Sequence, residues 1–312
     1  MLQSTALYTY GALMKLSVAP MMDVTDRHCR YFHRLLSPHA VLYTEMITSM
    51  ALAKGNRVDF LRFSAEEQPV VLQLGGSDPA MLAEAAAMGV NAGYREINLN
   101  CGCPSDRVQA GRFGACLMRE PETVAACVHS MRAAVPKDVP ITIKTRLGVD
   151  AEDSYDFLRA FIEPVAAAGA QHFILHARKA YLKGLSPKQN RTRPPVNYER
   201  VYQVKRDYPA LLITLNGEVK TIADAERHLP HVDGVMIGRE AWHNPYILAE
   251  FEQALYGTPL PTREAIMADY SLYARNQLKS GALKSALTRA VLGLYKHQPN
   301  GKNRLNFSAW DE

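Results

Sequence analysis

Residues 140–178 read PITIKTRLGVDAEDSYDFLRAFIEPVAAAGAQHFILHAR and contain a strand pattern, a helix pattern and a second strand pattern, in that order. The two flanking runs, 140–146 and 172–178, are short, mostly apolar and bounded by turn residues, as strands are. Residues 154–168 have apolar side chains at helical spacing and begin with Ser154, a residue type that often starts helices. This unit predicts parallel strands joined by a helix.

The same alternation extends in both directions along the chain. Strand patterns lie at residues 15–20, 40–46, 69–75, 94–100, 140–146, 172–178, 211–217 and 234–239, and the clearest helical patterns between them lie at 79–88, 121–135, 154–168 and 221–227. Eightfold alternation suits a TIM (β/α)₈ barrel, which typically needs about 250 residues. An open doubly wound sheet is the alternative. It would carry a G-x-G-x-x-G turn after the first strand, where this chain has Ala-Pro-Met-Met-Asp.

The character of the chain changes after the barrel. Residues 259–261 are Pro-Leu-Pro, which suggests a hinge, and helical patterns follow at 263–279 and 283–296. We therefore expect a catalytic barrel at residues 1–257 and a small helical domain at 258–312. Helical periodicity stops after Lys296, so we expect this second domain to be shortened at its end.

Composition limits the class of protein. The 312 residues are 47% hydrophobic and carry a formal charge of +5, which suits an anionic partner without requiring one. No run of about 18 apolar residues could span a bilayer, and no signal peptide is evident at the start. The cysteines are odd in number and scattered, as free thiols are. We expect a cytoplasmic monomer without a membrane segment.

Polar side chains stand at the ends of six of the predicted strands. In a TIM barrel these ends converge on one face, where the chemistry takes place. A single residue of this kind could be a satisfied core group, but six polar strand ends favour a functional site because buried polar groups are costly unless paired. The residues are Gln73, Asn98, Asn100, Lys144, Arg146, His176, Arg178, Asn216 and Arg239.

The loop after the fourth strand contains two cysteines, in the sequence Asn100-Cys101-Gly102-Cys103-Pro104-Ser105-Asp106. A zinc site needs about four ligands, and no second cysteine or histidine pair stands at suitable spacing, so we expect no metal. Cys103 lies between glycine and proline, which favours an exposed turn, although a lone loop cysteine can also be structural. Thiols with the ordinary pKa of about 8.5 are protonated at neutral pH and can serve as general acids.

A strongly basic region follows the sixth strand. Residues 178–207 contain nine Lys or Arg against one Glu and one Asp, interleaved with Tyr181, Tyr198 and Tyr202. Such a run can be a solvated surface. Basic residues with aromatic neighbours beside a catalytic mouth would also suit an RNA backbone and its unstacked bases.

Nine short motifs follow one another along the strands and the loops after them: Val18-Ala19-Pro20-Met21, Tyr43-Thr44-Glu45-Met46, Leu72-Gln73-Leu74-Gly75, Ile97-Asn98-Leu99-Asn100, Gly102-Cys103-Pro104-Ser105, Ile143-Lys144-Thr145-Arg146, His176-Ala177-Arg178, Asn216-Gly217 and Ile237-Gly238-Arg239. Taken together, these motifs resemble those of the tRNA dihydrouridine synthases over about residues 16–295, most closely the bacterial subfamily A, which modifies D-loop uridines 20 and 20a.

The resemblance implies FMN at the barrel mouth and NADPH as its reductant. Positive charge from Lys144 would stabilise the anionic reduced ring, and the glycine loops after the last two strands would hold the phosphate. The implied cofactor-binding residues are Pro20, Met21, Met22, Gln73, Lys144, His176, Asn216, Gly217, Glu218, Gly238 and Arg239.

The resemblance also implies the roles toward substrate. Hydride would pass from the reduced flavin to C6 of a flipped uracil, and Cys103 would protonate C5. Cys101 stands where a small aliphatic residue is commoner, and Cys103 is expected to be the acid because Pro-Ser follows it. Expected uracil or tRNA contacts are Asn100, Arg146, Arg178, Lys179, Lys188 and Arg191.

Two alternatives and one departure accompany this reading. The chain could instead be an FMN barrel oxidoreductase of a small molecule, or a tRNA-binding protein that has lost catalysis. The resemblance implies a further Arg-rich helix after residue 295, where this chain shows no helical pattern. We therefore expect weaker tRNA binding than in the family at large.

Overall fold

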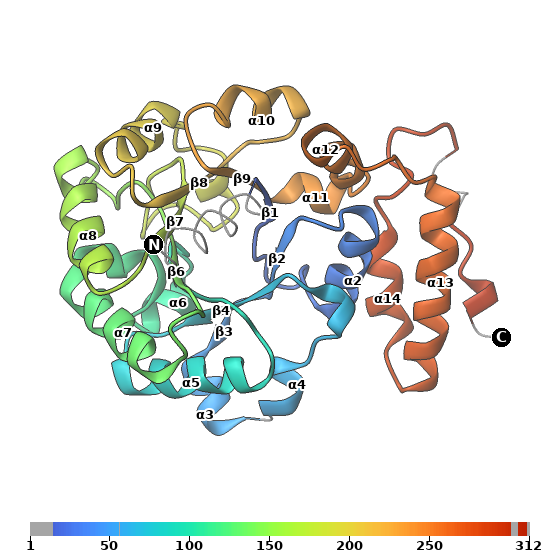
Figure 1. Ribbon diagram of the computed structural model, residues 1–312, viewed down its shortest axis with the longest axis horizontal. Coiled ribbons are helices and arrows are strands. Elements are labelled where there is room, and N and C mark those ends of the chain that lie inside the picture. The colour runs from blue at the N-terminus through green and yellow to red at the C-terminus, as the bar shows by residue number, and fades with distance from the viewer. Residues whose placement is uncertain (1–14, 56, 301–304, 311–312) are drawn as a thin grey trace.

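The computed structural model describes residues 15–55, 57–300 and 305–310 (Figure 1). Within these residues, eight parallel strands pair in a closed circle, because β1 pairs with both β2 and β9 while β2 pairs with β4. The predicted TIM barrel is therefore confirmed: seven strands lie inside their predicted ranges, and β5 extends one residue beyond the predicted 94–100. The strands are β1 (Leu16–Val18), β2 (Val41–Tyr43), β4 (Val70–Gly75), β5 (Ile97–Cys101), β6 (Ile141–Thr145), β7 (His172–His176), β8 (Leu212–Asn216) and β9 (Gly234–Ile237).

Helices surround the strands in Figure 1 and connect each to the next. Asp78 caps α5 by accepting a hydrogen bond from the N–H of Met81 at 2.8 Å, and Ser154 caps α8 through the N–H of Phe157 at 3.0 Å. The helices of the barrel are α2 (Arg27–Leu36), α3 (Ser49–Lys54), α4 (Arg57–Leu61), α5 (Pro79–Asn91), α6 (Asp106–Ala110), α7 (Pro121–Ala134), α8 (Tyr155–Ala167), α9 (Tyr198–Asp207), α10 (Ile222–His228), α11 (Arg239–His243) and α12 (Ile247–Tyr256). Short 3₁₀ helices lie at Ala65–Glu67, Gly114–Arg119 and Gln189–Arg191.

The apolar core has two parts because successive strand residues face opposite sides of the sheet. Leu72 and Ile97 face outward and approach Gly89 of α5, where a side chain would collide with them. A smaller cluster of six residues lies apart from this outer core: Ala19, Val41, Tyr43, Val71, Ile174 and Met236. Five of them belong to strands and Ala19 follows β1, so this cluster is the apolar filling of the barrel interior.

The second predicted strand differs from the structure at its end. The pattern predicted one strand over residues 40–46, but β2 ends at Tyr43 and a two-residue strand, β3 (Ile47–Thr48), follows. Tyr43 pairs with Val71, whereas Ile47 pairs with Leu74, so three residues, 44–46, face two on β4. The extra residue forms a bulge, which interrupts the pairing with β4. A local sequence pattern cannot reveal such a bulge, because it depends on the neighbouring strand.

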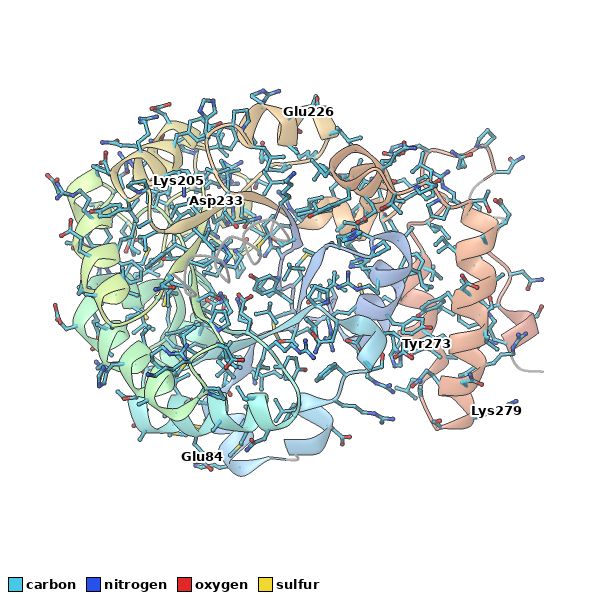
Figure 2. All side chains as sticks on the ribbon, viewed as in Figure 1. Glu84, Lys205, Glu226, Asp233, Tyr273 and Lys279 are labelled. Atoms are coloured by element: carbon cyan, nitrogen blue, oxygen red, sulfur yellow. The ribbon has the colours of Figure 1, made fainter. Side chains whose placement is uncertain are left out.

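Two further helices, α13 (Arg263–Lys279) and α14 (Lys284–Val291), pack beside α2 outside the barrel (Figure 1). Tyr273 of α13, labelled in Figure 2, stacks on Tyr31 with ring centroids 3.7 Å apart, and its hydroxyl forms a hydrogen bond with His28 Nδ1 at 2.8 Å. The first predicted helix agrees with α13. The second is shorter than the predicted 283–296, because the chain turns after Val291. A domain boundary near residue 258 stays a prediction.

Candidate active site

A chain of buried amide groups connects the carboxyl ends of β4 and β5. Gln73 donates from Nε2 to Asn98 Oδ1 at 2.8 Å and accepts at Oε1 from Asn100 Nδ2 at 2.9 Å. All three side chains are inside the barrel, as the polar strand ends predicted, and each is nine-tenths buried or more. Since each amide holds the next, Gln73 and Asn100 are oriented before any ligand arrives.

This series of hydrogen bonds continues from Asn98 toward the bottom of the barrel, through side chains that the sequence analysis did not select as site residues. Asn98 donates from Nδ2 to Thr142 Oγ1 at 2.9 Å, and Thr142 donates in turn to Glu96 Oε1 at 2.7 Å. The hydroxyl of Tyr43 also lies 3.5 Å from Glu96 Oε1. Both the carboxylate and the hydroxyl are buried, and burial raises the pKa of Tyr43 well above its ordinary value. Each hydrogen bond of this network joins side chains of two different strands, or joins a strand to Glu96, which directly precedes β5.

The Cys103 loop, residues 101–105, is held at the mouth of the barrel by its backbone. Asn100 Oδ1 accepts hydrogen bonds from the N–H groups of Gly102 and Cys103, at 3.1 and 3.0 Å. The carbonyl of Cys103 accepts from Ala115 N at 2.9 Å, and its thiol is partly exposed, 3.5 Å from Ser105 Oγ. A partly exposed thiol on a fixed backbone can deliver a proton to one defined point.

Cys101 has the opposite environment. It is the last residue of β5, its side chain is fully buried, and burial raises its thiol pKa well above the ordinary value. The two cysteines of the C-x-C motif are therefore on different sides of the barrel wall. Only Cys103 is accessible to a molecule in the mouth.

Lys144 and Arg146 bring positive charge to the same mouth. Lys144 Nζ donates a hydrogen bond to Asn216 Oδ1 at 3.1 Å, and this bond joins β6 to β8. Its pKa is lowered to about 7, first because burial strips water from the ammonium and second because Arg146 lies nearby. Arg146 donates from Nε to the carbonyl of Gly102 at 3.2 Å and from Nη1 to that of Asn190 at 3.0 Å, and burial lowers its pKa to about 10.

His176, Arg178 and Glu218 complete the cationic side. Burial, followed by the charges of four surrounding cations, lowers the pKa of His176 well below its ordinary value, so its imidazole is neutral. Arg178 is almost fully buried and pairs with the carboxylate of Glu218 through Nη2. Its Nε is buried with no hydrogen-bond partner. Arg178 was expected at the tRNA surface, but its burial favours a role toward an anion inside the mouth.

The loop after β8 has the backbone that an anion cradle needs. Gly217 has φ +125° and Glu218 has φ +56°, so two successive residues leave the ordinary right-handed region. A side chain at Gly217 would lie 3.1 Å from His176 Cδ2, so the loop can pass close to the imidazole only with glycine there. Together with the unpaired Nε of Arg178, this loop fits the phosphate of a flavin mononucleotide, and half-buried Lys144 fits its negatively charged reduced ring.

The remaining predicted cofactor residues lie around the rim. Pro20 and Met21 are half-buried after β1, whereas Met22 is 55% exposed. Gly238 follows β9 and has open space around it, so a substituted side chain would meet only Ala19, at 3.9 Å. Arg239 donates to the carbonyl of Arg191 at 3.4 Å, which brings the loops after β7 and β9 together.

The basic loop, residues 178–193, separates into two kinds of cation. Lys179 is held by Asp153 at 2.9 Å and lies 5.0 Å from the ring centroid of Tyr181. Lys188 and Arg191 are exposed, although partial burial and the charge of Arg239 lower the pKa of Arg191. Lys183 and Arg193 are exposed as well, so these four cations of the loop are the ones that a large polyanion could reach.

Two residues that organise these loops were missed by the sequence analysis. The Asn190 side chain bonds to the N–H and carbonyl of Tyr181, at 2.7 and 2.9 Å, and so closes the basic loop on itself. Gln109 donates from Nε2 to the carbonyl of Pro104 at 2.9 Å and to that of Leu182 at 2.8 Å. No local pattern signals either role, because the partner of Gln109 is 73 residues away.

A separate hollow of about 360 Å³ lies at the other end of the barrel, where β9 begins. Lys205 and Asp233 on its wall already pair at 2.9 Å and are labelled side by side in Figure 2, so its charges are satisfied. No cluster of three His, Cys, Asp or Glu suited to a metal occurs among the described residues. No helix in the described part of the chain combines the length and apolar character needed to cross a bilayer.

Comparison with solved structures supports the architecture. The chain resembles a 2-naphthoyl-CoA reductase in complex with 2-naphthoyl-CoA, with a TM-score of 0.59 and 12% sequence identity. The match covers 81% of this chain and about half, 51%, of that one. At this identity the likeness concerns the fold alone.

Comparison of sequences is far closer. A protein of Vibrio cholerae named tRNA-dihydrouridine(20/20a) synthase is 55% identical over 291 residues, which cover 92% of this chain and 88% of the relative. Proteins of the same name from Yersinia pestis and Synechocystis are 53% and 51% identical, covering 93% and 96% of this chain and 84% and 89% of theirs. The sequence profile described as dihydrouridine synthase matches residues 17–295, which include both sides of the barrel mouth and the Cys103 loop, and this chain therefore belongs to the dihydrouridine synthase family.

Proposed function

We propose that this protein reduces the C5–C6 double bond of uridines 20 and 20a in the D-loop of tRNA, using FMN and NADPH. Enzymes of the dihydrouridine synthase family are flavin-dependent oxidoreductases that act on tRNA. The position in the tRNA is supported by the shared name of relatives at 51–55% identity. FMN is supported by the backbone of the loop 216–218, by the unpaired Nε of Arg178 and by the half-buried Lys144.

The observation that carries this proposal is the position of Cys103. Its thiol is partly exposed at the mouth, while its N–H and carbonyl are both bonded to the barrel. Cys103 donates its proton from Sγ to C5 of the uracil, and Asn100 keeps the donor in place through the backbone. Lys144 and Arg146 are near enough for a thiolate at Cys103 to raise their pKa values, so the charge left on sulfur is stabilised by cations.

The residues that would hold the flavin are Lys144, Arg178 and the loop 216–218, with Gln73 and His176 beside the ring. When bound, the reduced flavin supplies the hydride for C6 of the uracil. Gln73 keeps a fixed orientation because Asn98 and Asn100 both hold its amide. His176 remains neutral, so it can accept or donate a hydrogen bond without adding charge.

The exposed cations of the basic loop are proposed to bind the tRNA backbone. Lys188 and Arg191 lie on the same loop that contacts Arg146 and Arg239 at the mouth. Phosphates bound there would place the D-loop near Cys103. Residues 258–312 are proposed as a second, helical tRNA-binding part, and we propose a cytoplasmic monomer as the working form.

The test uses purified protein, FMN, NADPH and tRNA that lacks dihydrouridine. Mass spectrometry of nuclease fragments should find a gain of two hydrogens at uridines 20 and 20a. Product at other positions would contradict the proposed site specificity. Flavin reduction without any tRNA product would favour a small-molecule oxidoreductase or a tRNA-binding protein that has lost catalysis.

A further inference from the structure

Two polar ties join the Cys103 loop to the basic loop, one on each side of Cys103. On the preceding side, Arg146 bonds to the carbonyls of Gly102 and Asn190, at 3.2 and 3.0 Å. On the following side, Gln109 bonds to the carbonyls of Pro104 and Leu182, at 2.9 and 2.8 Å. Both neighbours of Cys103 are therefore attached to the loop that carries the exposed lysines and arginines.

Both N–H groups of Gln109 Nε2 take part in the tie between the two loops. Its Nε2 has two N–H groups, and the two carbonyls accept one each. Gln109 is on α6, which starts directly after the Cys103 loop, so a shift of that loop also moves Gln109. A movement of Leu182 must shift Pro104 or break a hydrogen bond. The neighbouring residue Lys183 is exposed, so a phosphate bound there would act next to the tie.

We propose that Gln109 is a positioning residue that transmits the docking of tRNA on the basic loop to the Cys103 thiol. This inference rests on the proposed function, in which Cys103 donates the proton to C5. Arg146 holds the other side of Cys103, but it also lies in the mouth, where it faces Lys144 and Cys103. Gln109 does not lie among those cations. Its replacement therefore changes how the Cys103 loop is positioned without removing a side chain that contacts the substrate.

The experiment compares Gln109→Ala and Gln109→Glu with the wild-type holoenzyme. A single turnover of pre-reduced enzyme with saturating tRNA should be about 10- to 100-fold slower in Gln109→Ala, because a misplacement of about 1 Å can cost that much. Gln109→Glu should be slower still, since it keeps the length but faces two carbonyls with a carboxylate. Flavin reduction by NADPH and tRNA affinity should stay at the wild-type level. The solvent deuterium isotope effect should rise, because proton transfer from Sγ limits the rate more strongly.

Gln171→Ala serves as the matched control, because Gln171 is an exposed glutamine just before β7. Its turnover should equal that of the wild type. The inference is overturned if both Gln109 variants turn over normally, or if Gln109→Glu is milder than Gln109→Ala, as simple packing would predict. It is also overturned if tRNA affinity and flavin reduction fall together with turnover. Failure of the proposed function would look different, because the wild type itself would then yield no dihydrouridine.

Discussion

The two sides of the barrel mouth are built on different principles. On the side of β4 and β5, the amides of Gln73, Asn98 and Asn100 satisfy one another in a neutral network. On the side of β6 to β9, half-buried Lys144 has a lowered pKa, and buried Arg178 has an unpaired nitrogen. The amides of the neutral side satisfy one another, whereas on the cationic side the carboxylate of Glu218 pairs with Arg178 and the partner of Lys144 is the uncharged amide of Asn216.

Neighbouring positions on β6 show the contrast within one strand. Thr142 and Lys144 face the same side of the sheet because they are two residues apart. Thr142 belongs to the neutral network, and Lys144 to the cationic side. Buried polar groups that satisfy one another stabilise a fold, while uncompensated charge costs stability and is typical of ligand sites. Four substitutions test this division.

The largest expected effect is at Cys103, where the neutral side fixes the proton donor. Cys103→Ala should lower the rate of dihydrouridine formation by about 100- to 10,000-fold, the usual loss for a general acid. NADPH should still reduce the flavin at the wild-type rate, because the cationic side is intact. Stopped-flow absorbance and mass spectrometry of tRNA separate the two steps. Cys101→Ala is the control and should keep most activity; swapped phenotypes would refute the assignment.

The second-largest effect is expected for Thr142→Val, which should lower the stability of the protein. Valine has nearly the same shape but removes both the donor to Glu96 and the acceptor for Asn98. We expect the free energy of unfolding to fall by about 1–3 kcal/mol, the usual cost of buried groups left unsatisfied. Urea unfolding of the flavin-free protein measures this. Thr123→Val, at a less buried threonine on α7, should change it little, and an equal loss there would argue against a stabilising network.

The third prediction concerns the cationic side: the affinity for FMN should depend on pH, because it depends on the charge of Lys144. Lys144 in the free protein loses its proton as pH rises through about 7, far below its ordinary value of 10.5. An anionic ligand stabilises the ammonium and raises its pKa, so the complex holds more protons and affinity falls as pH rises above about 7. Lys144→Met should bind FMN more weakly at pH 7, with a flatter pH profile. Fluorescence titrations measure both, and parallel profiles would contradict the charge of Lys144 as the cause.

The smallest effect concerns the exposed cations of the basic loop. Lys188→Ala should lower the slope of log affinity against log salt by about 0.7–0.9, the value for one lost phosphate contact. Lys179→Ala should lower it less, because Asp153 already neutralises Lys179. Filter binding of tRNA at several salt concentrations measures both slopes. Equal slopes for the two variants would mean that exposure does not select the RNA contacts.

The barrel and the polar strand ends at its mouth followed from local patterns in the sequence, whereas the roles of the loop residues were implied by the resemblance to the family. Strand ends with polar residues predicted Gln73, Lys144, His176 and Asn216 correctly as neighbours at one face, because parallel strands in a barrel all end there. The bulge after Tyr43 could not be predicted, since it depends on how β2 and β4 close the barrel. Burial of Arg178 was equally hidden, because its partner Glu218 lies 40 residues further on.

The sequence by itself determined the strand and helix units, the polar strand ends and the turn around Cys103, because each depends on residues only a few positions apart; the turn is partly buried, which the sequence did not predict. The tertiary structure alone decided which polar groups satisfy one another and which cations stay exposed. It also decided the ties of Arg146 and Gln109 to the basic loop, across 44 and 73 residues. These contacts arise only when the barrel closes and its loops meet, and their geometry then depends on the packing of the whole domain.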